Sequence, residues 1–262
     1  MMNLKDEVTL GKLSLLNRVL FSGFLLVIGL GFCASGAQIL MTHGMADGEL
    51  GLTHKDIVYS YYGNRNGSRL ENALNGKMKL KAPPEVNAVL IEWAHKGAPE
   101  SEWNTIAPLI NAHCSKCHAD DESDLPRIEK LDIAKSMVKV DEGASISTLT
   151  RVSHIHLFGI AFIFLYVGWI FSMAEFNHTL KVILIGSPFL FLILDVLSWW
   201  LTKYCPHFAV AIIISGFGYA IAAFIMLTEV LASPPIALPE LKSVQVTPLS
   251  ELVLSLMPVP FW

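Results

Sequence analysis

The chain has 262 residues, of which 53% are hydrophobic and only 16% charged, whereas ordinary soluble domains carry about 25% charged residues. Its formal net charge of −4 at pH 7 excludes a nucleic-acid-binding protein that acts through bulk positive charge. The apolar composition excludes a disordered chain, and four cysteines are too few for a disulfide scaffold, so much of the apolar surface must face a membrane.

The first predicted element is a transmembrane helix. Residues 19–41 carry no charge, and this run is long enough to cross a hydrocarbon core of about 30 Å as a helix. The cations Lys5, Lys12 and Arg18 precede it, which favours a cytoplasmic N-terminus. We therefore expect residues 1–42 to form an N-terminal segment and the first span.

Residues 43–153 hold most of the charges and are predicted to form a soluble domain inserted between the first and second spans. Within it, Cys114, Cys117 and His118 form a C-x-x-C-H motif. Two thiols one helical turn apart reach the two vinyl groups of one porphyrin, and the adjacent His lies under the iron as an axial ligand. No second Cys pair follows that would complete a zinc ribbon. The motif therefore predicts one covalently bound haem c.

With this motif, the segment resembles the mono-haem c-type cytochromes that bacteria anchor in their membranes. The resemblance extends to the loop 75–78, which contains Met78 and is followed by a helical pattern over residues 85–95. In class I cytochromes c a Met-bearing loop also precedes an apolar helix, but there the haem motif comes first, so this domain looks like a permuted relative. The resemblance implies a small α-helical domain in the periplasm, attached to the bacterial cytoplasmic (inner) membrane.

The second axial ligand of an electron-transfer haem is a thioether sulfur or an imidazole. Met78 is the first candidate, because its glycine-containing loop can approach a haem face closely. Met137 and His54 are the alternatives, and Met137 fits core packing in the helical pattern 128–138 equally well. Lysines flank Met78 and acidic residues follow the motif. The lysines are read as a docking surface for an acidic redox partner, and the alternative is that both stretches are ordinary solvated loops. These residues are Lys77, Lys79, Lys81, Asp120, Asp121, Glu122 and Asp124.

Three further apolar runs, residues 155–174, 182–202 and 208–228, predict the remaining spans within residues 154–232. Residues 233–262 are expected to form a tail, either a short interfacial helix or a disordered segment. Four spans and a periplasmic domain place both termini in the cytoplasm. The predicted fold class is therefore mainly α, with four transmembrane helices and a small α-helical periplasmic cytochrome c domain between the first and second helices.

Several ionisable residues lie in or beside these spans, where lipid makes them costly. They are His154, His156, Asp195 and His207. Three interpretations stay open: a His–Asp polar clamp between helices, a quinol site that feeds electrons to the haem, and a haem b held by two histidines. His154 and His156 are two residues apart, so they point to nearly opposite faces of one helix.

The sequence as a whole favours a membrane-bound mono-haem cytochrome c that acts as an electron-transfer subunit of a respiratory or oxidising membrane complex, rather than as a stand-alone catalyst. Its expected partners are other subunits of that complex, a soluble or membrane redox partner and the lipid bilayer, with no nucleic acid. The alternatives are a quinol-oxidising enzyme subunit and a haem-based sensor or structural subunit. A haem b or a quinone is a conceivable second cofactor.

Overall fold

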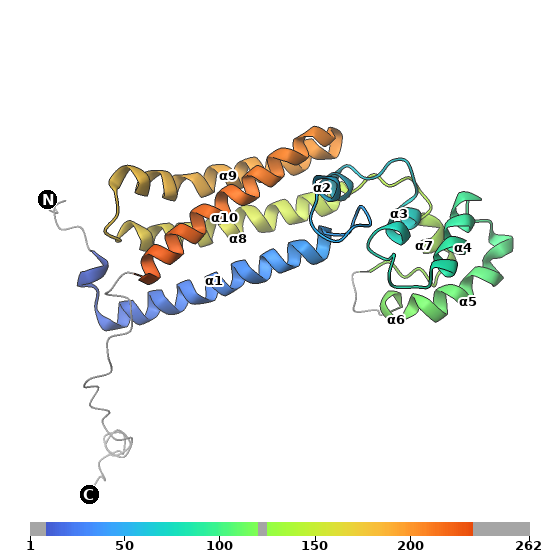
Figure 1. Ribbon diagram of the computed structural model, residues 1–262, viewed down its shortest axis with the longest axis horizontal. Coiled ribbons are helices and arrows are strands. Elements are labelled where there is room, and N and C mark those ends of the chain that lie inside the picture. The colour runs from blue at the N-terminus through green and yellow to red at the C-terminus, as the bar shows by residue number, and fades with distance from the viewer. Residues whose placement is uncertain (1–8, 120–124, 233–262) are drawn as a thin grey trace, which may run out of the picture.

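The computed structural model describes residues 9–119 and 125–232, and over these residues the fold is α-helical with one isolated antiparallel bridge and no strand. Four helices are long and apolar enough to cross a membrane, which confirms the predicted number of spans (Figure 1). They are α1 (Leu15–His43), α8 (Ile146–Ser172), α9 (His178–Tyr204) and α10 (Ala209–Ala232), the last preceded by the short 3-10 helix Pro206–Phe208. The predicted tail, 233–262, lies outside the described residues.

Polar side chains cap the beginnings of α8 and α9. Ser145 accepts a hydrogen bond from the backbone N–H of Thr148, and Asn177 accepts one from that of Leu180. Because Ser145 supplies this cap, α8 begins at Ile146, well before the apolar run at residue 155. The expected soluble segment 43–153 therefore ends inside a membrane helix.

The bundle exposes large apolar side chains on its outer faces. Phe158 is 61% exposed, Phe217 64% and Phe224 67%, although each belongs to a candidate span. Exposed apolar surface on this scale requires an apolar surround. The chain is therefore a membrane protein whose bundle contacts the lipid bilayer.

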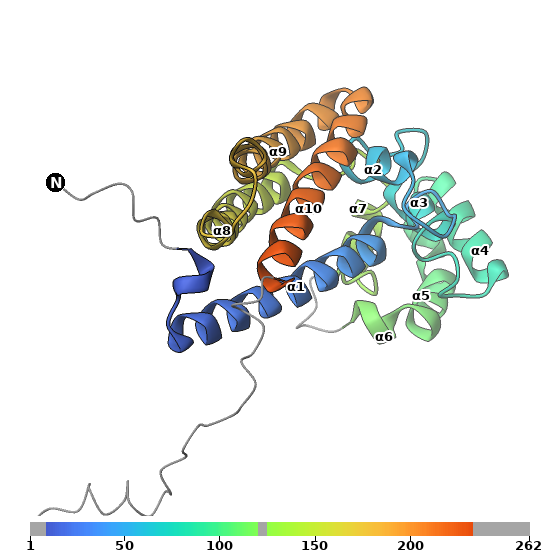
Figure 2. The same cartoon turned by 60° about the vertical axis from the view of Figure 1, so that its left-hand side comes forward.

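In the described residues between α1 and α8, six short α-helices and one 3-10 helix (Glu100–Glu102) separate into two parts (Figures 1 and 2). The six α-helices are α2 (His54–Tyr61), α3 (Arg69–Asn75), α4 (Pro84–His95), α5 (Trp103–His113), α6 (Ser115–His118) and α7 (Leu131–Ser136). Helix α2 lies across the end of the bundle, where Ile57 packs with Leu149, Val196 and Trp199. Helices α3 to α7 enclose a separate apolar core around Leu90, Trp93 and Ile106. The predicted single domain is thus a bundle cap plus a small helical domain.

Two chain segments, 62–68 and 138–145, connect these parts and are called the neck here. They pair through the Ser68–Val140 bridge, and the backbone N–H of Asp141 donates to the carbonyl of Gly67 at 3.1 Å. Gly63 has φ +89°, and a Cβ there would lie 2.2 Å from the carbonyl oxygen of Asp141. Only glycine tolerates this conformation and this approach, so the two segments touch backbone to backbone.

The neck is also fixed to the bundle. The Lys203 ammonium of α9 donates to the carbonyl of Glu142 at 2.8 Å, and Arg65 donates to the carbonyl of Lys203 at 3.3 Å. The backbone N–H of Ala144 donates to the carbonyl of Ser60 at the end of α2. The helical domain therefore leaves the bundle in a defined direction.

Candidate metal centre

The C-x-x-C-H motif lies at the junction of α5 and α6, at the edge of the helical domain. The backbone N–H of Cys114 still donates to the carbonyl of Ile110 at 2.8 Å, and Cys117 and His118 donate to the carbonyl of Cys114 at 3.1 and 3.0 Å. These bonds wind the motif into one turn. Cys117 and His118 thus follow Cys114 by three and four residues, the spacing of neighbours on a helix surface.

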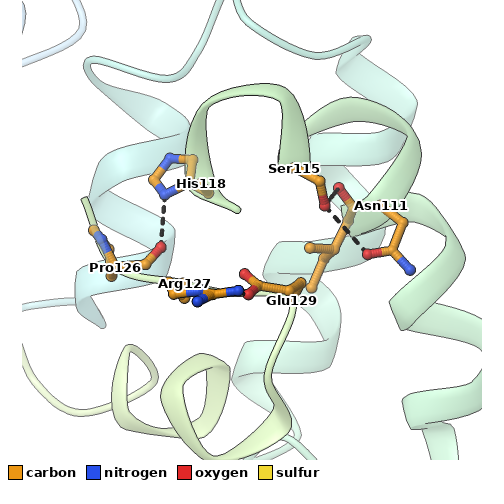
Figure 3. A network of polar contacts seen from close by, with 7 residues as sticks. Asn111, Ser115, His118, Pro126, Arg127 and Glu129 are labelled. Carbon is orange, nitrogen blue, oxygen red and sulfur yellow. Dashed lines mark hydrogen bonds and ion pairs between the residues drawn. The ribbon is translucent and has the colours of Figure 1, made fainter. Parts of the chain in front are cut away.

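The His118 imidazole is oriented by a backbone oxygen (Figure 3). Its Nδ1 lies 2.8 Å from the carbonyl oxygen of Pro126. A carbonyl only accepts, so Nδ1 carries the proton in this bond, and in the neutral imidazole Nε2 then keeps its lone pair. An imidazole held in this way is a typical metal ligand, since the bond fixes both ring orientation and tautomer.

Two further polar contacts hold the segments around the motif (Figure 3). Ser115 donates to the side-chain oxygen of Asn111 at 3.2 Å, which ties α6 to α5. Arg127 donates to the carboxylate of Glu129 at 2.8 Å, directly after Pro126 in the chain. These contacts stabilise the two segments that carry His118 and its oxygen partner.

The two thiols differ in their surroundings. Cys114 packs at the margin of the domain core, and burial raises the pKa of its thiol, whereas Cys117 is exposed. Within residues 9–119 and 125–232, no three or more His, Cys, Asp and Glu side chains converge to hold a metal ion directly. One oriented imidazole beside two thiols is the set that a c-type haem would require, since its iron would take one His nitrogen and its porphyrin carbons would bond to the thiols.

The structure separates the three candidates for the second axial ligand. Met78 and Met137 both pack against the same apolar core as Cys114. His54 is exposed on α2, which packs against the bundle and not against this core. The two methionines therefore share an apolar core with Cys114, whereas His54 belongs to the helix that packs on the bundle.

The Met78 loop is tightly packed. The backbone N–H of Met78 donates to the carbonyl of Ala73 at 2.8 Å, and a Cβ on Gly76 would lie 2.8 Å from the carbonyl of Ala46. Lys77 is half-buried, and burial lowers the pKa of its ammonium. Lys79 and Lys81 are exposed, whereas the acidic stretch 120–124 lies outside the described residues.

The predicted bundle residues are only partly brought together. Asp195 is buried, and its Oδ1 accepts a hydrogen bond from the indole Nε1 of Trp199 at 3.1 Å. The His156 ring lies edge-on to Trp199 with centroids 4.9 Å apart, while its Nδ1 faces the carbonyl of Val152 at 3.0 Å. Among the described residues, no hydrogen bond joins Asp195 to a histidine, so of the three open interpretations the His–Asp clamp is not supported. His154 and His207 are both exposed.

Sequence reasoning missed two tyrosines near Asp195. Tyr61 of α2 stacks on Trp199 with centroids 6.0 Å apart, and Tyr219 of α10 also lies within electrostatic reach of the carboxylate. Burial raises the pKa of Tyr61, and the charge of Asp195 raises it further. No local pattern announces these contacts, because the residues are distant in sequence and belong to three different helices.

Comparison with known proteins gives one match. A family model described as a transmembrane helical domain matches residues 135–234, which include α8, α9 and α10. No curated protein and no solved structure matches the chain. The match agrees with the membrane bundle and does not reach the C-x-x-C-H motif.

Proposed function

We propose that the chain is a membrane-anchored mono-haem c-type cytochrome that transfers electrons within a respiratory or oxidising membrane complex. The observation that carries this proposal is the orientation of His118. Its Nδ1 is held by the carbonyl of Pro126, so Nε2 is available to iron, on the residue that follows Cys117 and lies one helical turn from Cys114. A metal ligand, its orienting partner and both attachment groups are thus present together.

Each residue of the site has a defined role in this proposal. Cys114 and Cys117 hold haem through two thioether bonds, His118 is the first axial ligand, and Met78 is the preferred second ligand, with Met137 as the alternative. When bound, haem supplies an iron that cycles between the ferrous and ferric states. The Pro126 carbonyl keeps His118 in the ligating tautomer, and the apolar core beside Cys114 limits access of water.

The same proposal assigns a place in the cell. Haem c domains of the type that this segment resembles lie in the periplasm, so the neck and the helical domain are placed outside the bacterial cytoplasmic membrane. Exposed Lys79 and Lys81 beside Met78 would attract an acidic redox partner by an electrostatic force that salt screens. The remaining partners are other subunits of the complex.

Covalent haem attachment is tested by haem-dependent peroxidase staining of a denaturing gel, after production of the full chain with cytochrome c maturation factors. The wild-type chain is expected to stain at its own mass. Replacing both Cys114 and Cys117 with Ala should abolish the stain, because both thioether bonds are lost.

The chain supplies its own matched control, since Cys33 and Cys205 lie outside the motif. Replacing both of these with Ala removes the same number of thiols and should leave the stain intact. A wild-type chain that accumulates in the membrane without staining would refute the haem c proposal. Equal loss of stain in the control variant would show that the effect is not specific to the motif.

A further inference from the structure

The bundle buries a carboxylate that does not connect helices. Asp195 lies within α9 and is only 3% exposed. Its hydrogen bond comes from Trp199, one turn further along the same helix, and no cationic side chain pairs with it in the described part of the chain. An ionisable group at membrane depth is costly unless it is paired or functional. A structural role in holding helices together does not account for Asp195.

Aromatic side chains from other helices lie near this carboxylate. Tyr61 of α2 stacks on Trp199, the hydrogen-bond donor of Asp195, and the charge of Asp195 acts on the phenols of both Tyr61 and Tyr219 of α10. Neither tyrosine hydroxyl has a hydrogen-bond partner among the described residues. Tyr61 stacks on Trp199, and His156 meets the same indole edge-on. The cluster thus combines one acceptor, two free hydroxyls and flat ring surfaces.

The cluster lies beside a stretch where α1 does not cover the bundle. Phe32 of α1 stacks on Phe164, which also contacts Tyr219 at a centroid distance of 5.9 Å. Further along, His43 of α1 stacks on Tyr61. Every residue of α1 between these contacts, 33–42, is exposed. A molecule dissolved in the lipid can therefore approach Tyr219 between these two contacts.

We infer that Asp195, Tyr61 and Tyr219 form a binding site for the headgroup of a quinol. A quinol is dissolved in the membrane, has a flat ring for stacking, and carries hydroxyl groups that donate to a carboxylate and accept from phenols. A haem b held by two of the predicted bundle histidines is a poorer fit, because His154 and His207 are exposed and only His156 of these three approaches the cluster. His43 also stacks on Tyr61, but its Nδ1 is engaged with the Ser60 hydroxyl at 2.7 Å.

This inference rests on the proposed function, since the quinol is the electron donor of the haem. Oxidation of one quinol to a quinone breaks two O–H bonds and releases two electrons and two protons. The haem that Cys114, Cys117 and His118 would hold could accept these electrons one at a time, with the oxidised redox partner of the proposed complex taking the first electron before the second arrives. The Asp195 carboxylate accepts the protons one at a time and returns each to water.

Binding is tested with the full chain in lipid nanodiscs, titrated with decylubiquinone in its oxidised and reduced forms. Quenching of tryptophan fluorescence reports binding, because Trp199 lies in the cluster. Two variants keep the shape of the site. Tyr219→Phe removes a hydrogen-bond donor, and Asp195→Asn removes the negative charge of the acceptor. Each is expected to weaken binding of the reduced form about tenfold, as expected for a lost hydrogen bond to a buried polar group.

Tyr166→Phe is the matched control, because Tyr166 is a half-exposed tyrosine of α8 outside the cluster. It should bind as the wild type does. Two results would overturn the inference. One is that the quinol quenches the wild-type chain no more than it quenches the Trp199→Phe variant. The other is that both cluster variants bind as the wild type does. A haem b absorption spectrum that disappears in His156→Ala would also overturn it. Haem staining of the same samples separates the two proposals: a stained chain that does not bind refutes only the quinol site.

Discussion

The indole of Trp93 is the central side chain of the helical domain, and its replacement gives a quantitative test of that core. Trp93 is fully buried, its Nε1 donates to the carbonyl of Pro99 at 3.2 Å, and its ring lies 5.7 Å from that of Trp103. In Trp93→Phe the hydrogen bond is lost, which costs about 1 kcal/mol of unfolding free energy, since Pro99 keeps a second donor in the N–H of Glu102. The smaller ring leaves space that costs roughly a further 1 kcal/mol.

The expected total for Trp93→Phe is about 2 kcal/mol, which corresponds to a fall in melting temperature of roughly 8–16 °C for a domain of this size. Trp93→Ala should cost about 3–5 kcal/mol, close to the whole stability of a small domain, and leave it unfolded. The measurement is scanning calorimetry of the full chain in detergent. The domain should unfold in its own transition, because its core shares no buried residue with the bundle clusters.

Trp169→Phe serves as the control, because Trp169 is 56% exposed on the outer face of α8 and should leave the domain transition unchanged. The reasoning fails if Trp93→Phe leaves that transition at the wild-type temperature. It also fails if Trp169→Phe lowers it by the same amount, since the effect would then not depend on burial.

Three more outcomes are expected from the neck, the haem ligand and the topology. Gly63→Ala should destabilise the neck by roughly 3 kcal/mol, because the new Cβ requires an unfavourable positive φ and overlaps the backbone of the facing segment. Protease cleavage between the domain and the bundle should then increase. Cleavage at the wild-type rate would contradict the close approach of the two backbone segments. Met78→Ala should vacate the second axial position and let carbon monoxide bind ferrous haem, whereas Met137→Ala should not. The reverse pattern would assign the ligand to Met137. A periplasm-dependent reporter fused after Arg127 should be active and one fused within residues 177–179 silent, and activity at both sites would contradict the proposed topology.

The spans were predictable because each depends on a local property. A helix that crosses the bilayer needs a continuous apolar run, and all four runs were visible in the sequence. The start of α8 was missed because the cap Ser145 lies outside the apolar run, in a stretch that hydropathy alone assigns to a soluble segment. Local hydropathy thus locates a span without fixing its ends.

Contacts between distant residues were not predictable from the sequence. The motif at Cys114 predicts that His118 is a ligand, but not that the carbonyl of Pro126 would orient it, because a backbone oxygen has no signature in the sequence. Likewise, Asp195 was recognised as costly in lipid, whereas its approach to Tyr61 depends on how α2 lies across the bundle. Residue chemistry selected the candidates, and tertiary packing decided which of them meet.

The neck has a consequence for the order in which the protein folds during synthesis. Every buried residue of the domain core lies between Leu70 and Ala134, and the bridge that closes the domain is complete at Val140. At roughly 5–20 residues per second, the later spans take several seconds more to synthesise. The domain therefore has its full set of core residues before α8, α9 and α10 exist. Helix α2 cannot dock until those spans arrive, because its partners Leu149 and Trp199 belong to them.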